Sequence, residues 1–393
     1  MLLYLFRTQE EKMKKRVISM LVAATMTIGL LAACSSSTPA STGGAASSAA
    51  TEAASATEAA TEAASAAEEA STGTAESGNA GGGTYAIITK SAGNPYNERE
   101  ASGFQEVIEA AGGTPIIQHP EAITADAQIA VINSLISQGV DSICIAANDE
   151  NALQAVLQQA MDAGIKVSCL DSKVNASSRM TFVNQAGTVE IGQALMDAIH
   201  DIAGGEGQFA ILSATSQAAN QNAWIEAMQT IMEEDSKYAN LELVEIAYGD
   251  DEPQKSTDQT QALLTNYPDL KVICAPTTVG IAAAAKVLQD QGSPVKLTGL
   301  GLPSEMAEYI GDDDAHSCPY MFLWNPIDVG RLGAYTSMAL VEGTITGAEG
   351  ETFTAGTLGD YTIVAASDGG TEIILGPPFK FDPSNIEEWK SVY

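Results

Sequence analysis

Residues 84–118 contain a complete strand–helix–strand unit in one run, TYAIITKSAGNPYNEREASGFQEVIEAAGGTPIIQ. The apolar residues of 84–90 predict a buried strand. Asn94-Pro95 then supplies an N-cap and a first-turn proline for a helix, which ends at Gly112-Gly113. Residues 114–118 predict the next strand. Such a unit is typical of a parallel sheet covered by helices.

The same alternation continues to the C-terminus. Further strands are predicted at 141–146, 166–170, 207–213, 242–248, 271–275, 296–300, 318–323, 361–365 and 372–375. Helices are predicted between them, among others at 187–203, 217–234, 255–266, 277–291 and 326–343. The folded region is large for one sheet, so we predict an α/β fold of two doubly wound parallel-sheet lobes joined by a multi-strand hinge. Their predicted extents are 84–183 plus 302–345 for the N-terminal lobe, and 184–301 plus 346–393 for the C-terminal lobe.

Charge excludes several classes of partner. The 393-residue chain has 18 Lys and Arg against 50 Asp and Glu, for a formal net charge of −32. No basic stripe is present to neutralise phosphates, so we expect no nucleic-acid partner. A polybasic membrane anchor is excluded on the same ground.

The N-terminus predicts export. Basic residues between 12 and 16 precede an apolar run at 17–31, and the sequence Leu31-Ala-Ala-Cys34 follows. Such a segment is typical of a secretory signal, here residues 1–33, with Met13 as an alternative start. Its end resembles a lipobox, which predicts lipidation of Cys34. A retained signal anchor is the alternative, but the run is short for a membrane span.

Residues 34–83 have a composition that cannot form a core. They are rich in Ser, Thr, Ala and Gly, with Glu but no Lys or Arg, and they contain no large apolar side chain. We interpret this segment as a disordered tether. Together with a lipidated Cys34, it predicts an extracytoplasmic protein anchored to the outer face of the cell membrane.

Four further cysteines are Cys144, Cys169, Cys274 and Cys318. The first three lie in apolar runs that predict buried strands, and no CxxC or Cys/His cluster is present. We therefore expect free, buried thiols and no metal site. Cys144 and Cys169 lie on strands predicted to be neighbours, so a disulfide between them stays open.

Enzyme signatures are weak. The three histidines are scattered, and none lies beside a plausible Ser or Cys nucleophile in the expected geometry. Residues 299–304 (GLGLPS) resemble a dinucleotide loop but lack its third glycine. The acidic runs 250–252 and 312–314 are interpreted as solvated loops. We predict no enzymatic activity, no catalytic residue and no cofactor.

Polar side chains follow the predicted strands. In a doubly wound fold, ligands bind in the crevice at the carboxyl ends of the strands. The residues at those positions are Lys90, Asn94, Asn148, Asp171, Gln221, Pro276, Thr278 and Trp324. This amide-rich set fits a small, hydroxylated, sugar-like ligand. The alternatives are helix capping for Asn94 and core packing for Trp324.

Eight short motifs, in order along the chain, carry a family resemblance. They are Gly93–Tyr96, Leu170–Ser172, Val183–Gln185, Asn220–Trp224, Tyr248–Asp251, Gly299–Ser304, Leu323–Pro326 and Gly376–Pro378. From Thr84 onward the chain resembles type I periplasmic sugar-binding proteins, most closely the branch that binds rhamnose or autoinducer-2. The resemblance implies an extracytoplasmic solute-binding lipoprotein of an ABC importer. Its implied ligand-binding residues are Lys90, Asp171, Asn220, Gln221, Pro276 and Thr278. With Asn94, Tyr96 and Trp324, which lie near predicted strand ends or in the quoted motifs, they make nine predicted ligand-binding residues.

Two of these positions depart from the autoinducer-2 pattern. Asn220 replaces an aspartate and Thr278 replaces an alanine, and the amide removes a charge and strong acceptor sites. Rhamnose or another deoxysugar therefore stays open beside autoinducer-2. The resemblance implies a monomer that closes around the sugar by hinge motion and delivers it to a membrane permease. The alternatives are a sensing module docked on a sensor-kinase ectodomain, and a secreted α/β enzyme.

Overall fold

The computed structural model describes residues 82–393. The predicted signal peptide, Cys34 and nearly all of the predicted tether lie outside the described residues. Within the described part, no helix is both long enough and apolar enough to cross a membrane.

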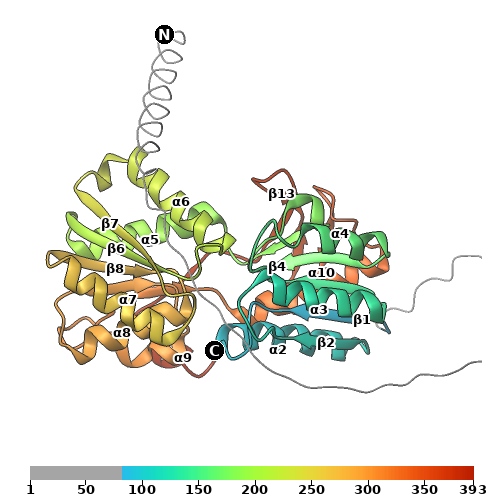
Figure 1. Cartoon of the computed structure of the whole chain (residues 1–393), viewed down its shortest axis with the longest axis horizontal. Helices are drawn as coiled ribbons and strands as arrows, with labels where there is room; N and C mark the ends of the chain where they lie inside the picture. Colours follow the sequence, from blue (N-terminus) through green and yellow to red (C-terminus); the bar gives the residue numbers. More distant parts are fainter. Residues whose placement is uncertain (1–81) are drawn as a thin grey trace, which may run out of the picture. The chain divides into compact units, whose positions relative to one another are not determined.

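The first lobe is built on a seven-stranded sheet (Figure 1), in the order β13-β14-β5-β4-β3-β1-β2. Its strands are β1 (Thr84–Ile88), β2 (Thr114–Gln118), β3 (Ser142–Ile145), β4 (Lys166–Leu170), β5 (Phe182–Asn184), β13 (Val364–Ala365) and β14 (Thr371–Ile374). All neighbours are parallel except the β13–β14 pair. The helices are α2 (Pro95–Ala110), α3 (Ala125–Gln138), α4 (Gln154–Asp162) and α10 (Pro326–Glu342). Contacts of α2 with α10 and of α3 with α4 cover the two faces.

The second lobe is built on a parallel four-stranded sheet in the order β7-β6-β8-β9. The strands are β6 (Gly207–Ser213), β7 (Leu241–Tyr248), β8 (Leu270–Ala275) and β9 (Lys296–Gly299). Four helices cover it in two packed pairs, α5 (Thr188–Ala203) with α6 (Ala219–Glu234) and α7 (Pro253–Asn266) with α8 (Thr278–Asp290). Short elements complete the chain: α9 (Pro303–Met306), β10 (Met321–Leu323), β11 (Thr352–Thr354), β12 (Asp360–Thr362), β15 (Phe379–Phe381) and α11 (Ile386–Trp389).

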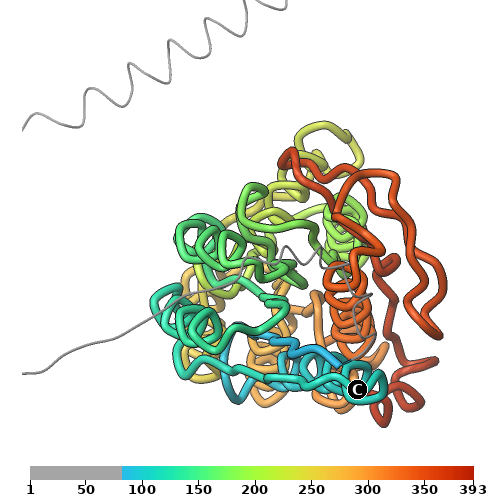
Figure 2. Tube along the Cα trace, turned by 90° about the vertical axis from the view of Figure 1, so that its right-hand side faces the viewer, coloured from blue at the N-terminus to red at the C-terminus, as the bar shows by residue number. Residues whose placement is uncertain are grey.

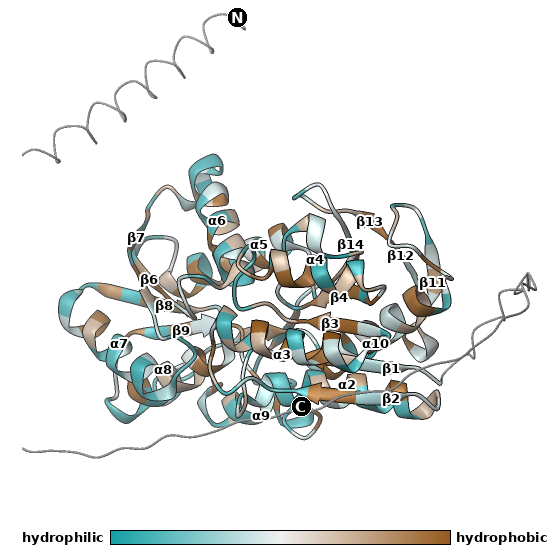
Figure 3. Ribbon diagram, turned by 45° about the vertical axis from the view of Figure 1, so that its right-hand side comes forward, coloured by the Kyte–Doolittle hydropathy of each residue, from teal (hydrophilic) through white to brown (hydrophobic). Residues whose placement is uncertain are grey.

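Local sequence accounts for the helix ends. The Asn94 side chain accepts the Tyr96 N–H at the start of α2, and Pro95 occupies the first turn. Helix α3 ends at Gly139, whose φ of +67° places it in the left-handed region. Figure 3 shows the hydrophobic residues concentrated on the strands and the hydrophilic residues on the outer helix faces. Apolar strands covered by helices with polar outer faces agree with the predicted α/β architecture of two doubly wound lobes.

The lobe membership of two segments differs from the extents predicted from sequence. Strand β14 pairs with β5, with Ile373 opposite Val183, so residues 364–374 belong to the first sheet. Conversely, the segment before β10, which was predicted to belong to the first lobe, lies on the second lobe. It is held there by the Leu297 N–H, which donates to the Ser317 carbonyl (2.8 Å). The reason is burial, because Phe182 and Val183 on β5 need a neighbouring strand on their open side.

The chain crosses between the sheets three times as a result. The crossings follow β5, β10 and β14, at about residues 185, 324 and 376, whereas the sequence predicted them near 184, 302 and 346–358. Figure 2 shows the C-terminal segment, in red, along one side of the molecule.

The strand register excludes a disulfide between Cys144 and Cys169. Strands β3 and β4 are neighbours, but Cys144 is paired with Ser168 and Cys169 with Ile145. Adjacent residues of a strand point to opposite faces, so the two thiols point to opposite sides of the sheet. Cys144 lies in the core under α2 and α10, and Cys169 in the core under α3 and α4. All four cysteines of the described part are free and buried.

Candidate functional site

A cavity lies at the carboxyl ends of the strands of both lobes. It encloses about 370 Å³ of empty space, part of which is continuous with solvent. Its lining includes all nine predicted site residues: Lys90, Asn94, Tyr96, Asp171, Asn220, Gln221, Pro276, Thr278 and Trp324. The lining is completed by Asn97, Trp224, Asp251, Thr277, Leu300 and Leu323. Nine of the fifteen lining residues were therefore predicted from the sequence.

Lys90, Asp171 and Asn220 form a buried polar triad within the cavity. The Lys90 ammonium donates to Asn220 Oδ1 at 2.9 Å and lies 3.4 Å from Asp171 Oδ2. The Asn220 amide nitrogen donates to the same Asp171 oxygen at 3.2 Å. Because Lys90 and Asp171 follow strands of the first lobe and Asn220 begins α6 of the second, the triad joins the two lobes.

Asp171 is held by further donors and by an unusual backbone. The Tyr96 hydroxyl and the Gln185 amide each donate to Oδ1 at 3.3 Å. Its φ of +56° lies in the left-handed region, which side chains other than glycine adopt at a cost. Ionised carboxylates accept such bonds strongly, so four donors offset the loss of water around Asp171.

Hydrogen bonds that involve the amide side chains of Asn148 and Gln128 hold the backbone of Lys90 in place. Asn148, at the end of β3, donates to the Lys90 carbonyl at 2.9 Å and does not line the cavity. The Asn148 N–H in turn donates to the side chain of Gln128 on α3 at 2.8 Å. Asn148, one of the polar residues predicted at the strand ends, therefore holds the backbone of Lys90 in place.

Three aromatic side chains, of Tyr96, Trp224 and Trp324, line the cavity beside the triad. Trp324 Nε1–H donates to the Tyr96 hydroxyl at 2.6 Å, and its ring meets that of Trp224 edge-on at 5.7 Å between centroids. Burial, with the nearby Glu100 and Asp171 carboxyls, raises the pKa of Tyr96 well above its ordinary value, so the phenol keeps its proton. Trp324 thus both packs in the core and contacts the site.

Asp251 is a cavity residue that the sequence reasoning missed. The run 250–252 was interpreted as a solvated loop, but the structure turns Asp251 into the cavity, where Thr277 donates to its carboxylate. Burial raises its pKa, although the Thr277 bond works against that change. Positive φ angles at Asp250 and Asp251 produce the inward turn. The available signal was its position directly after β7, at the edge where the other site residues lie. The run 312–314 is exposed, as expected.

Residues 85–345 match the model of the periplasmic binding protein domain. The chain belongs to this family. The match spans both lobes and contains every cavity residue named above.

Solved structures and a curated relative extend this result. An ABC transporter solute-binding protein from Clostridium phytofermentas, with bound L-rhamnose, is 63% identical over 80% of this chain and 100% of its own, with a TM-score of 0.79. LsrB from Clostridium saccharobutylicum in complex with AI-2 is 22% identical over 78% of this chain and 99% of its own, with a TM-score of 0.71. The D-ribose/D-allose-binding protein of Pseudomonas aeruginosa is 25% identical over 54% of this chain and 69% of its own. The predicted family and the predicted fold are confirmed.

This periplasmic binding protein has acceptor atoms without partners near its cavity. The side-chain oxygens of Asn148, Gln185 and Gln221 are buried, and none has a hydrogen-bond partner within the described residues. Of the three residues, Gln221 lines the cavity. A buried acceptor without a partner is costly, so this oxygen favours a ligand that supplies an O–H or N–H donor.

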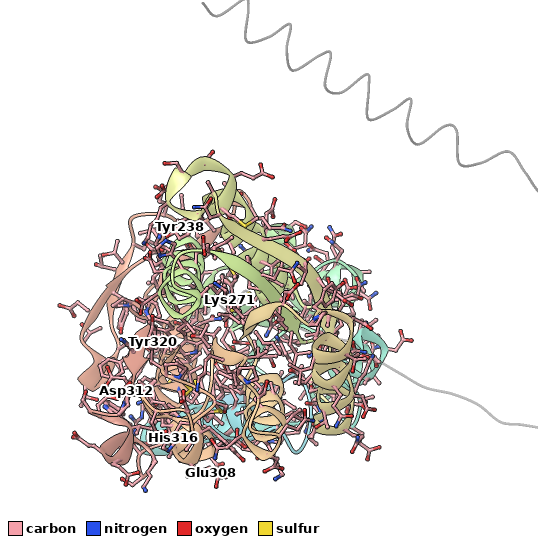
Figure 4. The ribbon with its side chains drawn as sticks, turned by 90° about the vertical axis from the view of Figure 1, so that its left-hand side faces the viewer. Tyr238, Lys271, Glu308, Asp312, His316 and Tyr320 are labelled. Atoms are coloured by element: carbon pink, nitrogen blue, oxygen red, sulfur yellow. The ribbon has the colours of Figure 1, made fainter. Side chains whose placement is uncertain are left out.

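The histidines of the binding protein lie elsewhere. His119 is bonded to Thr89 at 2.8 Å and His316 to Asp313 at 2.7 Å, and His200 packs edge-on against Tyr238. Figure 4 looks at the end of the second lobe, where His316 lies among surface side chains. Among residues 82–393, no group of three or more His, Cys, Asp or Glu side chains could hold a metal ion.

Proposed function

We propose that this protein captures a 6-deoxyhexose, L-rhamnose or a close analogue, and delivers it to the permease of an ABC importer. The observation that carries the proposal is a cavity lined both by a charged and amide triad and by aromatic and aliphatic side chains. A deoxyhexose has the same two kinds of group, with ring hydroxyls on most of its carbons and one methyl group.

The polar part of the lining offers both kinds of hydrogen-bonding group. Lys90 is a donor only, Asp171 is an acceptor only, and Gln221 brings an acceptor that has no partner within the described part of the chain. A sugar hydroxyl both donates and accepts, so it can satisfy both kinds of group. Wrong placement of a hydroxyl leaves one of these buried groups unpaired, which is the basis of selectivity.

The apolar part of the lining discriminates a methyl group from a hydroxymethyl group. Leu300, Leu323 and Pro276 line the cavity together with the two tryptophans. L-mannose differs from L-rhamnose by one hydroxyl on its sixth carbon. Placing that hydroxyl against aliphatic side chains without a partner costs roughly 1–3 kcal/mol.

Asn220 departs from the aspartate of the autoinducer-2 pattern and favours an uncharged ligand. Its amide oxygen faces Lys90 and its amide nitrogen faces Asp171. An aspartate at this position would place a second carboxylate about as close to Asp171 as the amide nitrogen is now, and like charges at that distance repel. The amide therefore completes a triad with balanced charge, which suits a ligand that brings none.

Placement in the cell is part of the same proposal. We infer that Cys34 is lipidated after removal of residues 1–33, and that the tether carries the binding lobes outside the cytoplasmic membrane. Sugar binding would close the lobes about the three crossings and present surfaces of both to the permease. We propose no turnover, and release of unchanged sugar is the expected outcome of binding.

Calorimetry with matched sugars tests the proposal. We expect the purified protein to bind L-rhamnose, to bind L-mannose about tenfold or more weakly, and to bind D-ribose and autoinducer-2 weakest. Recovery of unmodified sugar from the complex separates a receptor from an enzyme. Tight binding of autoinducer-2 alone, or no heat with any carbohydrate, would contradict the assignment.

A further inference from the structure

Glu100 is a fully buried carboxyl group that the sugar site leaves unexplained. It lies on α2, one turn after Tyr96, and its exposed fraction is 0%. Neither of its carboxyl oxygens has a hydrogen-bond partner among the described residues. Burial of an isolated carboxylate is far more costly than burial of the neutral acid, so this position needs a physical reason.

Two close helix contacts keep water away from Glu100. A Cβ on Gly330 of α10 would lie 1.9 Å from the Glu100 carbonyl oxygen, and one on Gly103 of α2 would lie 2.0 Å from that of Ile327. The backbones of α2 and α10 therefore touch where they cross, which leaves no room for solvent between them. This burial, with the nearby Asp171 charge, raises the pKa of Glu100 well above its ordinary value, against smaller opposing contributions from Lys90 and Tyr96.

The surrounding charges place the proton on Glu100. The titratable groups that face it are Tyr96 on its own helix, Lys90 after β1, Asp171 after β4 and Cys144 on β3. Among these, Lys90 is the one cation for two carboxyls. Asp171 receives bonds from three neighbours in addition to its contact with Lys90, whereas Glu100 receives none. Ionised carboxylates require such donors, so Asp171 carries the charge.

We propose that Glu100 is a positioning residue of the sugar site, which leaves the arrangement of Tyr96 and Asp171 undisturbed only as the neutral acid. The inference rests on the proposed sugar-binding function. Loss of the proton puts a second negative charge behind Asp171, where it repels that carboxylate and competes for Lys90. The closed, sugar-bound form therefore retains the Glu100 proton more strongly than the open form. By linkage, the affinity for sugar falls as the pH rises.

The test compares pH profiles of affinity. We expect the Kd of the full-length protein for L-rhamnose to rise as the pH is raised from mildly acidic to alkaline, by at most about tenfold per pH unit. Glu100→Gln, neutral at every pH, should match the wild-type affinity in acid and keep it in alkali. Glu109→Gln, at an exposed position of the same helix, should retain the wild-type profile. Parallel profiles for the wild type and Glu100→Gln would overturn the proposal.

Infrared spectroscopy gives a second reading that does not depend on sugar. The wild type should show the carbonyl band of a protonated carboxylic acid at neutral pH, and Glu100→Gln should lack it. Absence of that band overturns the inference even if rhamnose binds. If the band is present but no carbohydrate binds at any pH, the proposed function fails, and with it the coupling to binding.

Discussion

Replacing Asp171 by Asn removes one charge from the cavity and preserves the shape of the side chain. Asparagine tolerates the left-handed region as well as aspartate does, so the φ of +56° adds no new strain. The Lys90 ammonium, 3.4 Å from Asp171 Oδ2, then lacks its counter-charge. One end of the new amide also presents N–H groups to donors such as Gln185, 3.3 Å away.

The size of the effect follows from the burial of the pair. Removing one partner of a buried, hydrogen-bonded charge pair costs about 2–5 kcal/mol. The Lys90 side chain retains 9% exposure, and the amide can keep one of the bonds from Tyr96 or Asn220. We therefore expect the lower half of that range, about 2–3 kcal/mol, which weakens L-rhamnose binding by about 30-fold to about 150-fold.

Calorimetric titration with L-rhamnose measures this loss directly. The matched control is Asp368→Asn, because Asp368 pairs with Arg179 at 2.8 Å outside the cavity. That variant should lower the free energy of unfolding and leave the Kd unchanged. The reasoning is refuted if Asp171→Asn binds L-rhamnose within about threefold of the wild type, since a charge worth so little cannot organise the site.

Three further predictions concern other parts of the same lobe and site. Trp324→Phe removes the indole N–H that donates to the Tyr96 hydroxyl at 2.6 Å. We expect calorimetry to show L-rhamnose binding weakened by about tenfold. An unchanged Kd would show that binding does not depend on this hydrogen bond. In Gly330→Ala, the new Cβ would lie 1.9 Å from a backbone oxygen of α2, so α10 has to move away from α2. This change should lower the free energy of unfolding, measured in urea, by about 1–3 kcal/mol. An unchanged unfolding midpoint would contradict the close crossing of the two helices. Burial opposes ionisation of Asp368, but a backbone N–H and Arg179 outweigh it and hold its pKa below the ordinary 3.8. Ionised Asp368 therefore stabilises the fold above pH 3.8, and this contribution is lost as the pH falls further. In Asp368→Asn, the free energy of unfolding should decrease less steeply with falling pH in this acidic range.

The cavity residues could be predicted because strand order and strand ends are local properties. Lys90 and Asp171 directly follow continuously apolar runs, and such runs in strand–helix alternation predict parallel strands. Parallel strands bring their carboxyl ends to one edge, so residues far apart in sequence are expected to converge there. The polar residue types at those ends then indicated a hydroxylated ligand before any contact was known.

Other features depended on tertiary contacts that no local pattern contains. Strand β5 has three residues, too few for periodicity, and its partner β14 lies 190 positions later in the chain, with Ile374 opposite Asn184. The inward turn of Asp251 depends on a positive φ that the sequence Asp250-Asp251 permits but does not require. The burial of Glu100 arises from the helix crossing, and a glutamate on an amphipathic helix is ordinarily expected at the surface.

The crossings between the lobes and the cavity use the same residues. Gln185, directly after β5, donates to Asp171, and Trp324, directly after β10, donates to Tyr96. Rotation of the lobes about these crossings therefore displaces donors of the site itself. A ligand that stabilises the triad and the aromatic side chains also stabilises one geometry of the crossings, so binding free energy contributes directly to closure. For this reason, substitutions at the cavity and at the crossings should be energetically coupled rather than additive.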